Sequence, residues 1–323
     1  MAENKTLIEV RNLKKYFEVK GKGTLHAVDD VNFEIRVGET LGLVGESGCG
    51  KSTVGNVLMG LLPATGGEVF LNGENIVGLK RKERKNYCKE MQIVFQDPYS
   101  SLNPRKSVMQ ILSEPFKIHR MGNAKEIRKE VEELCEKVGL EPALLSKYPH
   151  ELDGGKRQVV GIARALALGP KFIVCDEPVS ALDVSIQAKI INLLIDLQKK
   201  LGLTYLFVSH DLSVVRHISN RVAVMYLGQI VEIADTDEIF ENPKHPYTTA
   251  LLSAVLNIDV SKNKEHIVLQ GDVPSPINPK PGCRFAPRCR FAKPECFENG
   301  PTLQELSPGH LVACFYPGQE EPG

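Results

Sequence analysis

The sequence predicts an α/β fold in which helices alternate with the strands of a mostly parallel sheet. Short apolar runs bounded by Gly, Asp or Pro recur along the chain and are typical of buried strands. Charged segments between them carry apolar residues three and four positions apart, which predicts amphipathic helices. A glycine-rich stretch, Gly45 to Thr53, joins one such run to one such segment. Together these three patterns favour the α/β class.

The strands can be placed from the apolar runs. Five buried strands are predicted at Leu41 to Val44, Gln92 to Phe95, Phe172 to Cys175, Tyr205 to Val208 and Val222 to Met225. More exposed, antiparallel strands are predicted at Leu7 to Val10, Val31 to Ile35 and Glu68 to Leu71. The prediction is therefore a parallel core sheet with additional antiparallel strands.

Two helices have clear sequence signals. Apolar residues repeat at three and four positions from Ile127 to Val138, so an amphipathic helix is predicted there, ended by Gly139. A second helix is predicted from Ile186 to Lys200, with Asp183 as its N-cap and Gly202 at its end.

Two parts of the chain depart from the alternation of strands and helices. Residues 98–165 show helical patterns and no convincing strand, so a helical subdomain is predicted within a main domain of residues 1–254. From residue 255 to residue 323 the composition shifts to Pro, Gly and Cys. Proline removes backbone donors and blocks helix continuation, so this C-terminal extension is predicted to be rich in loops.

Composition excludes some classes of function. Forty basic residues balance forty acidic ones and are spread along the chain, so nucleic acid is not an expected partner. The N-terminus lacks the apolar core of a signal peptide, and no stretch approaches the roughly 20 apolar residues that span a bilayer. We expect a soluble, cytosolic chain whose thiols stay reduced.

The glycine-rich stretch has the P-loop pattern of a nucleotide site. Its glycines let backbone N–H groups turn toward phosphates, and the following helix adds the positive end of its dipole. Lys51 is expected to reach the β and γ phosphates of ATP, and Ser52 to bind Mg²⁺. The candidate contacts are Gly45, Glu46, Ser47, Gly48, Cys49, Gly50, Lys51, Ser52 and Thr53. The alternative is a glycine-rich turn without a ligand, but the apolar run before it and the helical segment after it favour nucleotide.

A second motif ends in carboxylates. The apolar run Phe172 to Cys175 leads into Asp176 and Glu177, and α/β folds place their ligands at the carboxyl ends of strands. Asp176 is expected to hold Mg²⁺ through water, and Glu177 to orient or deprotonate the attacking water. Alone, such a pair is usually a solvated strand end. Beside a P-loop it indicates ATP hydrolysis.

Four further motifs follow in order: Gln96 after a strand, Leu152 to Gln158 before a helix, Ser180 to Asp183, and His210 at a strand end. Singly, each could be a surface side chain, a glycine turn or a helix cap. In sequence order with the two motifs above, they resemble the ABC ATPases. The resemblance implies an ABC-type P-loop NTPase with a RecA-like parallel core, a helical subdomain and a Cys-rich C-terminal extension.

The same resemblance implies roles for individual residues. Gln96 would contact Mg²⁺ and the attacking water, and His210 would hydrogen-bond the γ-phosphate. The adenine would stack on Phe17, with Tyr16 as the fallback and core packing as the competing explanation for either ring. Further nucleotide contacts are implied at Asp153, Gly154, Gly155 and Asp183.

Two segments and the cysteine-rich end narrow the resemblance to the ATP-binding subunits of oligopeptide and dipeptide ABC importers. The segments are Gln96 to Pro104 (QDPYSSLNP) and Asn242 to Leu252 (NPKHPYTTALL). The resemblance implies a second homologous ATPase subunit, in a heterodimer, two membrane permease subunits and, indirectly, an extracellular substrate-binding protein. It places the chain at the cytoplasmic face of the cell membrane, where dimer closure on ATP energises peptide uptake. Nickel, glutathione or oligosaccharide import, and a soluble ABC NTPase without a transport role, stay open as alternatives.

The signature loop departs from the family pattern. The usual sequence is LSGGQ, whereas this chain has LDGGK, with Asp153 and Lys156 at the changed positions. A carboxylate near a triphosphate repels it, although Asp153 suits a helix N-cap and Lys156 can restore positive charge. The alternatives are a tolerated variant and a pair of unequal ATP sites, in which the site completed by Asp153 is the slower.

Four thiols crowd the C-terminal extension, at Cys283, Cys289, Cys296 and Cys314. Such a set suits tetrahedral zinc or an iron–sulfur cluster. The paired C-x-x-C knuckles of zinc ribbons are absent, and the resembling importers can carry a [4Fe-4S] cluster here. This cluster is therefore expected, with Zn²⁺ and free thiols as the alternatives. Either metal would order a segment that has few apolar residues.

Overall fold

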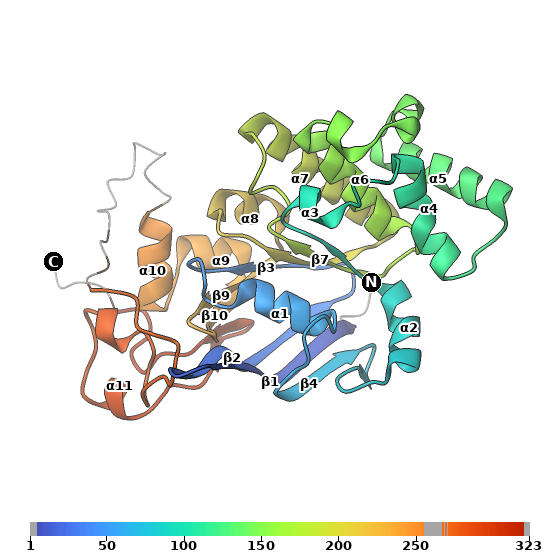
Figure 1. Ribbon diagram of the computed structural model, residues 1–323. Coiled ribbons are helices and arrows are strands. Elements are labelled where there is room, and N and C mark those ends of the chain that lie inside the picture. The colour runs from blue at the N-terminus through green and yellow to red at the C-terminus, as the bar shows by residue number, and fades with distance from the viewer. Residues whose placement is uncertain (1–4, 255–266, 268, 270, 320–323) are drawn as a thin grey trace. The chain divides into compact units, whose positions relative to one another are not determined.

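The computed structural model of this chain describes residues 5–254, 267, 269 and 271–319. Within these residues the chain forms two compact units (Figure 1). One, the helical unit, contains Lys5 and residues 36–39 and 79–208. The other, the P-loop unit, contains residues 6–35 and 40–78 and the described residues from 209 onward.

Three parallel strands form the sheet of the helical unit. They are β6 (Met91–Val94), β7 (Phe172–Asp176) and β8 (Thr204–Val208), with β7 between the other two. Every residue of β7 and β8 is buried, as is typical of a parallel sheet covered on both faces. The predicted bounds of these strands are confirmed to within one residue at each end.

The segment between β6 and β7 is helical, which confirms that residues 98–165 contain no strand. Its helices are α3 (Pro98–Ser101), α4 (Val108–Ile118), α5 (Ala124–Val138) and α6 (Gly154–Leu166), with short 3-10 turns at Pro142–Ser146 and Pro149–Glu151. α5 buries its apolar stripe and ends at Gly139, whose φ of 67° suits glycine, as predicted. The unit also contains α2 (Arg81–Glu90), which the sequence analysis did not predict, and α7 (Val184–Leu201).

One predicted interaction at the start of α7 is wrong. Asp183 occupies the N-cap position, but its side chain accepts no hydrogen bond from the helix. The backbone carbonyl of Asp183 accepts the N–H groups of Ile186 and Gln187, each at 2.9 Å, and the residue is exposed. The end of the helix at Gly202 is as predicted.

Antiparallel strands form one sheet of the P-loop unit, in the order β2-β1-β4-β5. Their bounds are β1 (Thr6–Val19), β2 (Gly23–Arg36), β4 (Gly66–Leu71) and β5 (Glu74–Asn75). β1 pairs antiparallel with β4, as predicted for Leu7 to Val10 and Glu68 to Leu71. The first two strands are much longer than their predicted cores, because alternating polar residues extend them beyond the apolar runs.

A second sheet of the P-loop unit joins segments far apart in sequence. β3 (Thr40–Val44) pairs parallel with β9 (Arg221–Tyr226), and β9 pairs antiparallel with β10 (Gln229–Asp235). The helices of this unit are α1 (Lys51–Leu58), α8 (Leu212–Ile218), α9 (Thr236–Glu241) and α10 (Pro246–Ser253). α8 packs against β3 so closely that a Cβ on Gly42 would lie 2.7 Å from Val215 Cγ1.

The described part of the C-terminal extension is mostly loop, as predicted, with a 3-10 turn at Ala286–Arg288 and the short helix α11 (Glu295–Glu298). It also contains two strands that the sequence analysis missed, β11 (Gln304–Ser307) and β12 (His310–Val312). β12 pairs antiparallel with β10, so the extension completes the second sheet. The predicted boundary at residues 254 and 255 borders residues that the structure does not describe. No helix within the described ranges is long and apolar enough to cross a membrane.

Candidate nucleotide site

The P-loop connects β3 to α1 in the P-loop unit. Gly45, Gly48 and Gly50 have φ angles of 149°, 79° and 110°, which side-chain-bearing residues rarely adopt. Added Cβ atoms on Gly45 and Gly50 would each lie 2.1 Å from a backbone oxygen, of Met225 and Ala27 respectively. Both positions therefore need glycine for space as well as for conformation.

Lys51 is buried at the start of α1. Its ammonium donates to the carbonyl oxygens of Gly45 at 2.8 Å and Glu46 at 3.0 Å, so it lies over the loop that precedes it. The residue before the helix is Gly50, which has no side chain to cap the first N–H groups. Such a helix start favours anions. Ser52 and Thr53 follow Lys51 in the first turn and are half-buried.

Three contacts from distant parts of the chain hold this loop. The backbone N–H of Glu46 donates to the hydroxyl of Tyr247 at 2.9 Å, and its carboxylate accepts two hydrogen bonds from Arg288 Nη1, at 3.1 and 3.0 Å. The carbonyl of Cys49 accepts from Gly228 N–H at 2.8 Å. No sequence pattern indicated the roles of Tyr247, Arg288 and Gly228. No local pattern indicates a contact across about two hundred residues.

The carboxylate motif lies in the helical unit. Asp176 ends β7 and is buried, and Glu177 follows with a φ of 44°. A positive φ is strained for glutamate. The N–H of Glu177 donates to the carbonyl of Val208 at 2.9 Å, which holds this backbone turn against β8. Gln96 Nε2 donates to Glu177 Oε2 at 2.8 Å, so the structure brings these two predicted residues together.

The signature loop also lies in the helical unit. Asp153 is the N-cap of α6, where its carboxylate accepts the Lys156 N–H at 2.8 Å and pairs with the Lys156 ammonium at 3.2 Å. The hydrogen bond from the Lys156 backbone is the main cause that lowers the pKa of Asp153. The predicted cap and the predicted charge compensation are both present. An added Cβ on Gly155 would lie 2.7 Å from Ile186 Cγ2, and on Gly154 3.2 Å from Leu182 Cδ2, so both glycines permit close packing.

The two candidate adenine platforms lie next to each other in β1. Tyr16 stacks on His26 with ring centroids 4.0 Å apart, and its hydroxyl donates to Asp29. The Lys15 ammonium lies 4.7 Å from the centre of the Phe17 ring. Each ring therefore already has a neighbour on one face, and the choice of Phe17 stays a prediction.

His210 and Asp183 are exposed side chains in connecting segments. His210 lies two residues after β8, in the P-loop unit, next to Asp211, which caps α8. Asp183 lies between β7 and α7, in the helical unit. Their contacts to nucleotide stay predictions.

The four cysteines of the extension line one small cavity of about 20 Å³. Backbone N–H groups hydrogen-bond three of the sulfur atoms, those of Cys283, Cys289 and Cys314. Burial raises the pKa of these three thiols, and that of Cys314 to about 12. Within the described part of the chain, however, no group of three or more His, Cys, Asp or Glu side chains is arranged to hold a metal ion. The predicted metal site is therefore not confirmed.

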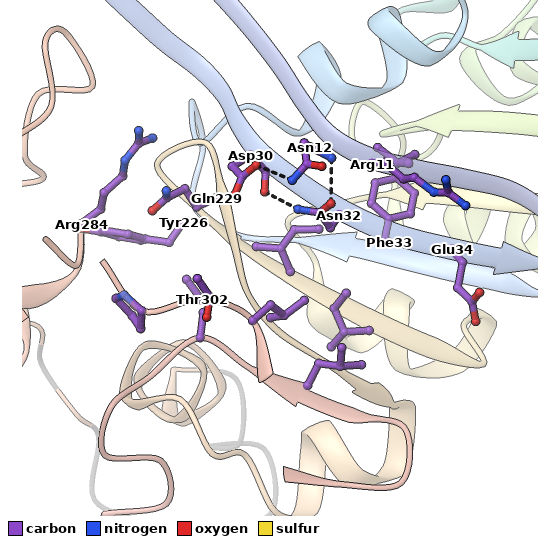
Figure 2. A pocket seen from close by; sticks show the side chains of 18 of the residues that line it. Arg11, Asn12, Asp30, Asn32, Phe33, Glu34, Tyr226, Gln229, Arg284 and Thr302 are labelled. Carbon is purple, nitrogen blue, oxygen red and sulfur yellow. Dashed lines mark hydrogen bonds between the residues drawn. The ribbon is translucent and has the colours of Figure 1, made fainter. Parts of the chain in front are cut away.

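A separate cavity of about 570 Å³ lies in the P-loop unit, between β1, β2, the β9–β10 hairpin and the extension (Figure 2). Its polar side chains bond one another: Asn12 Nδ2 donates to Asp30 Oδ1 at 2.9 Å, and Asn32 Nδ2 to the Asp30 carbonyl at 2.9 Å. Gly45 to Thr53 do not line it, so it is distinct from the P-loop.

Comparison with known proteins identifies the family to which this chain belongs. Residues 28–180 match the ABC transporter family, and residues 231–296 match the family described as oligopeptide/dipeptide transporter, C-terminal region. The oligopeptide transport ATP-binding protein AppF of Bacillus subtilis is 52% identical over 322 residues, covering 97% of this chain and 98% of that protein. OppF of Escherichia coli is 50% identical over 322 residues, covering 96% of each. The chain belongs to the oligopeptide/dipeptide family of ABC transporter ATPases.

Solved structures of ATP-binding cassettes share the fold of this oligopeptide-family ATPase. The dimeric ATP-binding cassette MJ0796, in a post-hydrolysis state bound to ADP and Pi, has a TM-score of 0.65 and 30% identity, covering 71% of this chain and 99% of that chain. CbiO1 of Clostridium perfringens has a TM-score of 0.66 and 29% identity, covering 80% of this chain and 96% of that chain. The predicted ABC-type P-loop fold and the predicted ATP hydrolase activity are thus confirmed.

Proposed function

We propose that this oligopeptide-family ABC ATPase energises the uptake of oligopeptides or dipeptides. The observation that carries the proposal is sequence identity of 52% and 50%, over nearly the full length, with two proteins named for oligopeptide transport. A dipeptide transport ATP-binding protein of Haemophilus influenzae is 49% identical over 320 residues. Both family matches fall in one chain, the ATP-binding cassette and the peptide-transporter C-terminal region.

The P-loop unit binds the triphosphate in this proposal. The backbone N–H groups of Gly45 to Thr53 and the uncapped start of α1 donate to the phosphates. Lys51, whose ammonium lies over carbonyls of the same loop, turns from them to the β and γ phosphates. His210 hydrogen-bonds the γ-phosphate, and Phe17 stacks on the adenine.

Mg²⁺, when bound, neutralises charge on the phosphates, and the oxygen donors offered for it are the Ser52 hydroxyl, the Gln96 amide oxygen and water held by Asp176. This all-oxygen set fits Mg²⁺. Glu177 accepts a proton from the attacking water. The Gln96 amide nitrogen, 2.8 Å from Glu177 Oε2, fixes the orientation of that carboxylate. The positive φ of Glu177, held by the hydrogen bond from its N–H to the Val208 carbonyl, sets the direction in which this side chain leaves the backbone.

The signature loop acts on the nucleotide of a partner in this proposal. Asp153, Gly154, Gly155 and Asp183 contact ATP held by a second homologous ATPase subunit, and the two subunits form a heterodimer beneath two membrane permease subunits. An extracellular substrate-binding protein delivers the cargo, and the ATPase works at the cytoplasmic face of the membrane. The site completed by Asp153 is the slower, because Lys156 offsets its carboxylate only in part: both side chains are about half exposed, at 54% and 49%.

We extend the proposal to a metal centre in the extension, a [4Fe-4S] cluster held by Cys283, Cys289, Cys296 and Cys314. Two observations support it: the four thiols share one cavity, and N–H donors are directed at three of the sulfurs. Such donors stabilise thiolates, which are the ligand form. Because these side chains are not arranged for ligation in the described structure, binding the cluster requires them to change position.

Metal analysis tests the proposed cluster directly. Protein purified under anaerobic conditions should contain about four iron atoms per chain, as the cluster formula requires. Stoichiometric zinc without iron would replace the cluster by a Zn²⁺ site. The absence of both metals would leave four free thiols and contradict either centre.

Uptake measurements test the main proposal. Cells that depend on this chain should lose uptake of a labelled tripeptide when Lys51 is changed to Ala, while the transporter still assembles. Persistent uptake would contradict an essential role for this P-loop. If peptide uptake is independent of the chain, and uptake of nickel, glutathione or an oligosaccharide is lost instead, the cargo assignment is wrong and the ATPase assignment stands.

A further inference from the structure

Glu46 places a carboxylate within the loop proposed to bind a polyanion. It is the second residue of the P-loop, and 30% of its side chain is exposed. A carboxylate there raises the electrostatic free energy of bound triphosphate unless a cation compensates it. Lys51 donates to the backbone of Glu46 and not to its carboxylate.

Arg288 compensates this carboxylate. Its Nη1 lies 3.1 Å from Glu46 Oε1 and 3.0 Å from Oε2, and 3.4 Å from the Tyr226 hydroxyl. Only 8% of the Arg288 side chain is exposed. Burial opposes its charge, but hydrogen bonds with Tyr226 and Glu46 outweigh that effect and raise the pKa of Arg288. The guanidinium is therefore a fixed positive charge beside the P-loop.

The position of Arg288 is held by an aromatic cluster. Phe285, three residues earlier in the extension, packs its ring against Tyr226 and Tyr247, with centroids 5.3 and 5.5 Å apart. Tyr226 and Tyr247 are themselves 4.6 Å apart, and Tyr247 accepts the Glu46 N–H. All three rings are among the most deeply buried in the described structure. Glu46 is thus held through its amide and its carboxylate by one packed group.

A second arginine of the extension reaches the loop indirectly. Arg284 donates to the carbonyl of Leu227 and to the carboxylate of Asp29, and it lines the cavity drawn in Figure 2, as Tyr226 does. The adjacent Gly228 N–H donates to the Cys49 carbonyl in the P-loop, and the Gly228 carbonyl accepts the Asp29 N–H, each at 2.8 Å. The turn between β9 and β10 therefore connects the extension to the other end of the loop.

From these contacts we propose that Arg288 is a positioning residue for ATP, and that the cysteine-rich extension thereby sets the affinity of the P-loop for Mg-ATP. This inference rests on the proposed nucleotide-binding role of the P-loop. The guanidinium neutralises Glu46 and fixes its side chain, so the loop can admit phosphates without like-charge repulsion. A lysine here would keep the charge, but its ammonium would have to reach the place of Arg288 Nη1, which alone makes the contacts to Glu46 and Tyr226.

Calorimetric titration of the full-length chain with Mg-ATP tests the inference. Arg288→Met should raise the dissociation constant by about tenfold, because it leaves the Glu46 carboxylate uncompensated. Glu46→Gln in the same background should restore affinity to within about twofold, since it removes the uncompensated charge. Arg288→Lys should fall between the wild type and Arg288→Met. Arg290→Met, two residues away with its guanidinium over the Phe291 ring, is the matched control.

The outcomes separate this inference from the function on which it rests. If Lys51→Ala leaves Mg-ATP affinity unchanged, the proposed P-loop role fails. If Lys51→Ala abolishes binding while Arg288→Met matches Arg290→Met, only the role of Arg288 is overturned. The role of Arg288 would also be overturned if Glu46→Gln failed to restore Mg-ATP affinity to Arg288→Met. Removing the carboxylate restores affinity only if Arg288 acts by neutralising it, and not if Arg288 has a purely structural role. If Arg288→Met does not fold, two other variants test the inference. Arg288→Lys should bind Mg-ATP more weakly than the wild type. Glu46→Gln alone should bind Mg-ATP as tightly as the wild type or more tightly.

Discussion

The two compact units differ in how they are assembled from the chain. The helical unit is built mainly from one continuous stretch, residues 79–208. The P-loop unit is gathered from residues 6–35, 40–78 and 209 onward, and its nucleotide loop is held by contacts from Gly228, Tyr247 and Arg288. Local patterns therefore determine most of the first unit, whereas long-range contacts determine the loop geometry of the second.

The largest expected effect tests the helical unit. Glu177→Gln should lower ATP hydrolysis by about 10² to 10⁴-fold, because the proton acceptor is lost. Mg-ATP binding should be retained. Steady-state turnover of the assembled transporter measures the loss, and Glu130→Gln, an exposed carboxylate in the same unit, is the control.

The same measurement addresses the unequal ATP sites. The equivalent change in the partner ATPase subunit should cost less turnover than Glu177→Gln, because the site completed by Asp153 is the slower. Equal losses from the two changes would contradict that asymmetry.

The next effect tests whether the extension is part of the P-loop unit. Phe285→Ala should lower the free energy of unfolding by about 3–5 kcal/mol, because a buried ring that packs on two tyrosines is removed. Urea unfolding measures it. Phe297→Ala, whose side chain is 53% exposed, should change stability by less than about 0.5 kcal/mol. If Phe285→Ala and Phe297→Ala changed stability equally, the extension would not be an integral part of the P-loop unit.

A pH-dependent effect tests the pairing of β12 with β10. His310 Nε2 lies 2.7 Å from the fully buried carboxylate of Glu232, and this hydrogen bond is the main cause that raises the pKa of His310. The charged pair therefore stabilises fully below the unfolded-state pKa of about 6.5, and the contribution is lost as pH rises through the higher folded-state value.

His310→Gln should accordingly lower the thermal midpoint most near pH 6 and least near pH 9. Thermal unfolding at several pH values measures this difference. His217→Gln provides an exposed-histidine control from α8. A loss of stability that is the same at all pH values would show that His310 contributes by packing alone.

The smallest effect tests a local interaction of the helical unit. Asp153→Ala should lower the free energy of unfolding by about 1 kcal/mol, because the N-cap hydrogen bond to Lys156 N–H is lost. Asp153→Ser keeps a capping oxygen and should leave stability within about 0.5 kcal/mol of the wild type. If Ser and Ala cost the same, the cap is not what Asp153 contributes.

Sequence patterns predicted the helical unit well because its signals are local. Apolar runs marked β7 and β8, and Gly139 marked the end of α5, since both depend on residues close in sequence. The pairing of Gln96 with Glu177 was not predicted as a contact, but both residues were identified from their motifs. At Asp183 the predicted N-cap position was correct, but the side chain makes no cap hydrogen bond, which the residue type alone does not reveal.

The P-loop unit was predicted less completely. The glycines of the loop were identified, but the residues that hold the loop were not, because Tyr247 and Arg288 lie 201 and 242 positions away from Glu46. β11 and β12 were missed for the same reason, since a short strand at the edge of a sheet is defined by its partner. The four cysteines were identified as a set from their spacing, and their common cavity agrees with that grouping.

The pairing of β12 with β10 also sets an order of events during synthesis. β10 ends at Asp235, but the strand that covers its edge begins at His310, so the ribosome must add about seventy-five further residues before the sheet can be completed. During that interval β10 presents unpaired backbone groups, which is the usual route to wrong strand pairing. Nascent chains that stall before residue 310 are therefore the form of this protein most in need of a chaperone.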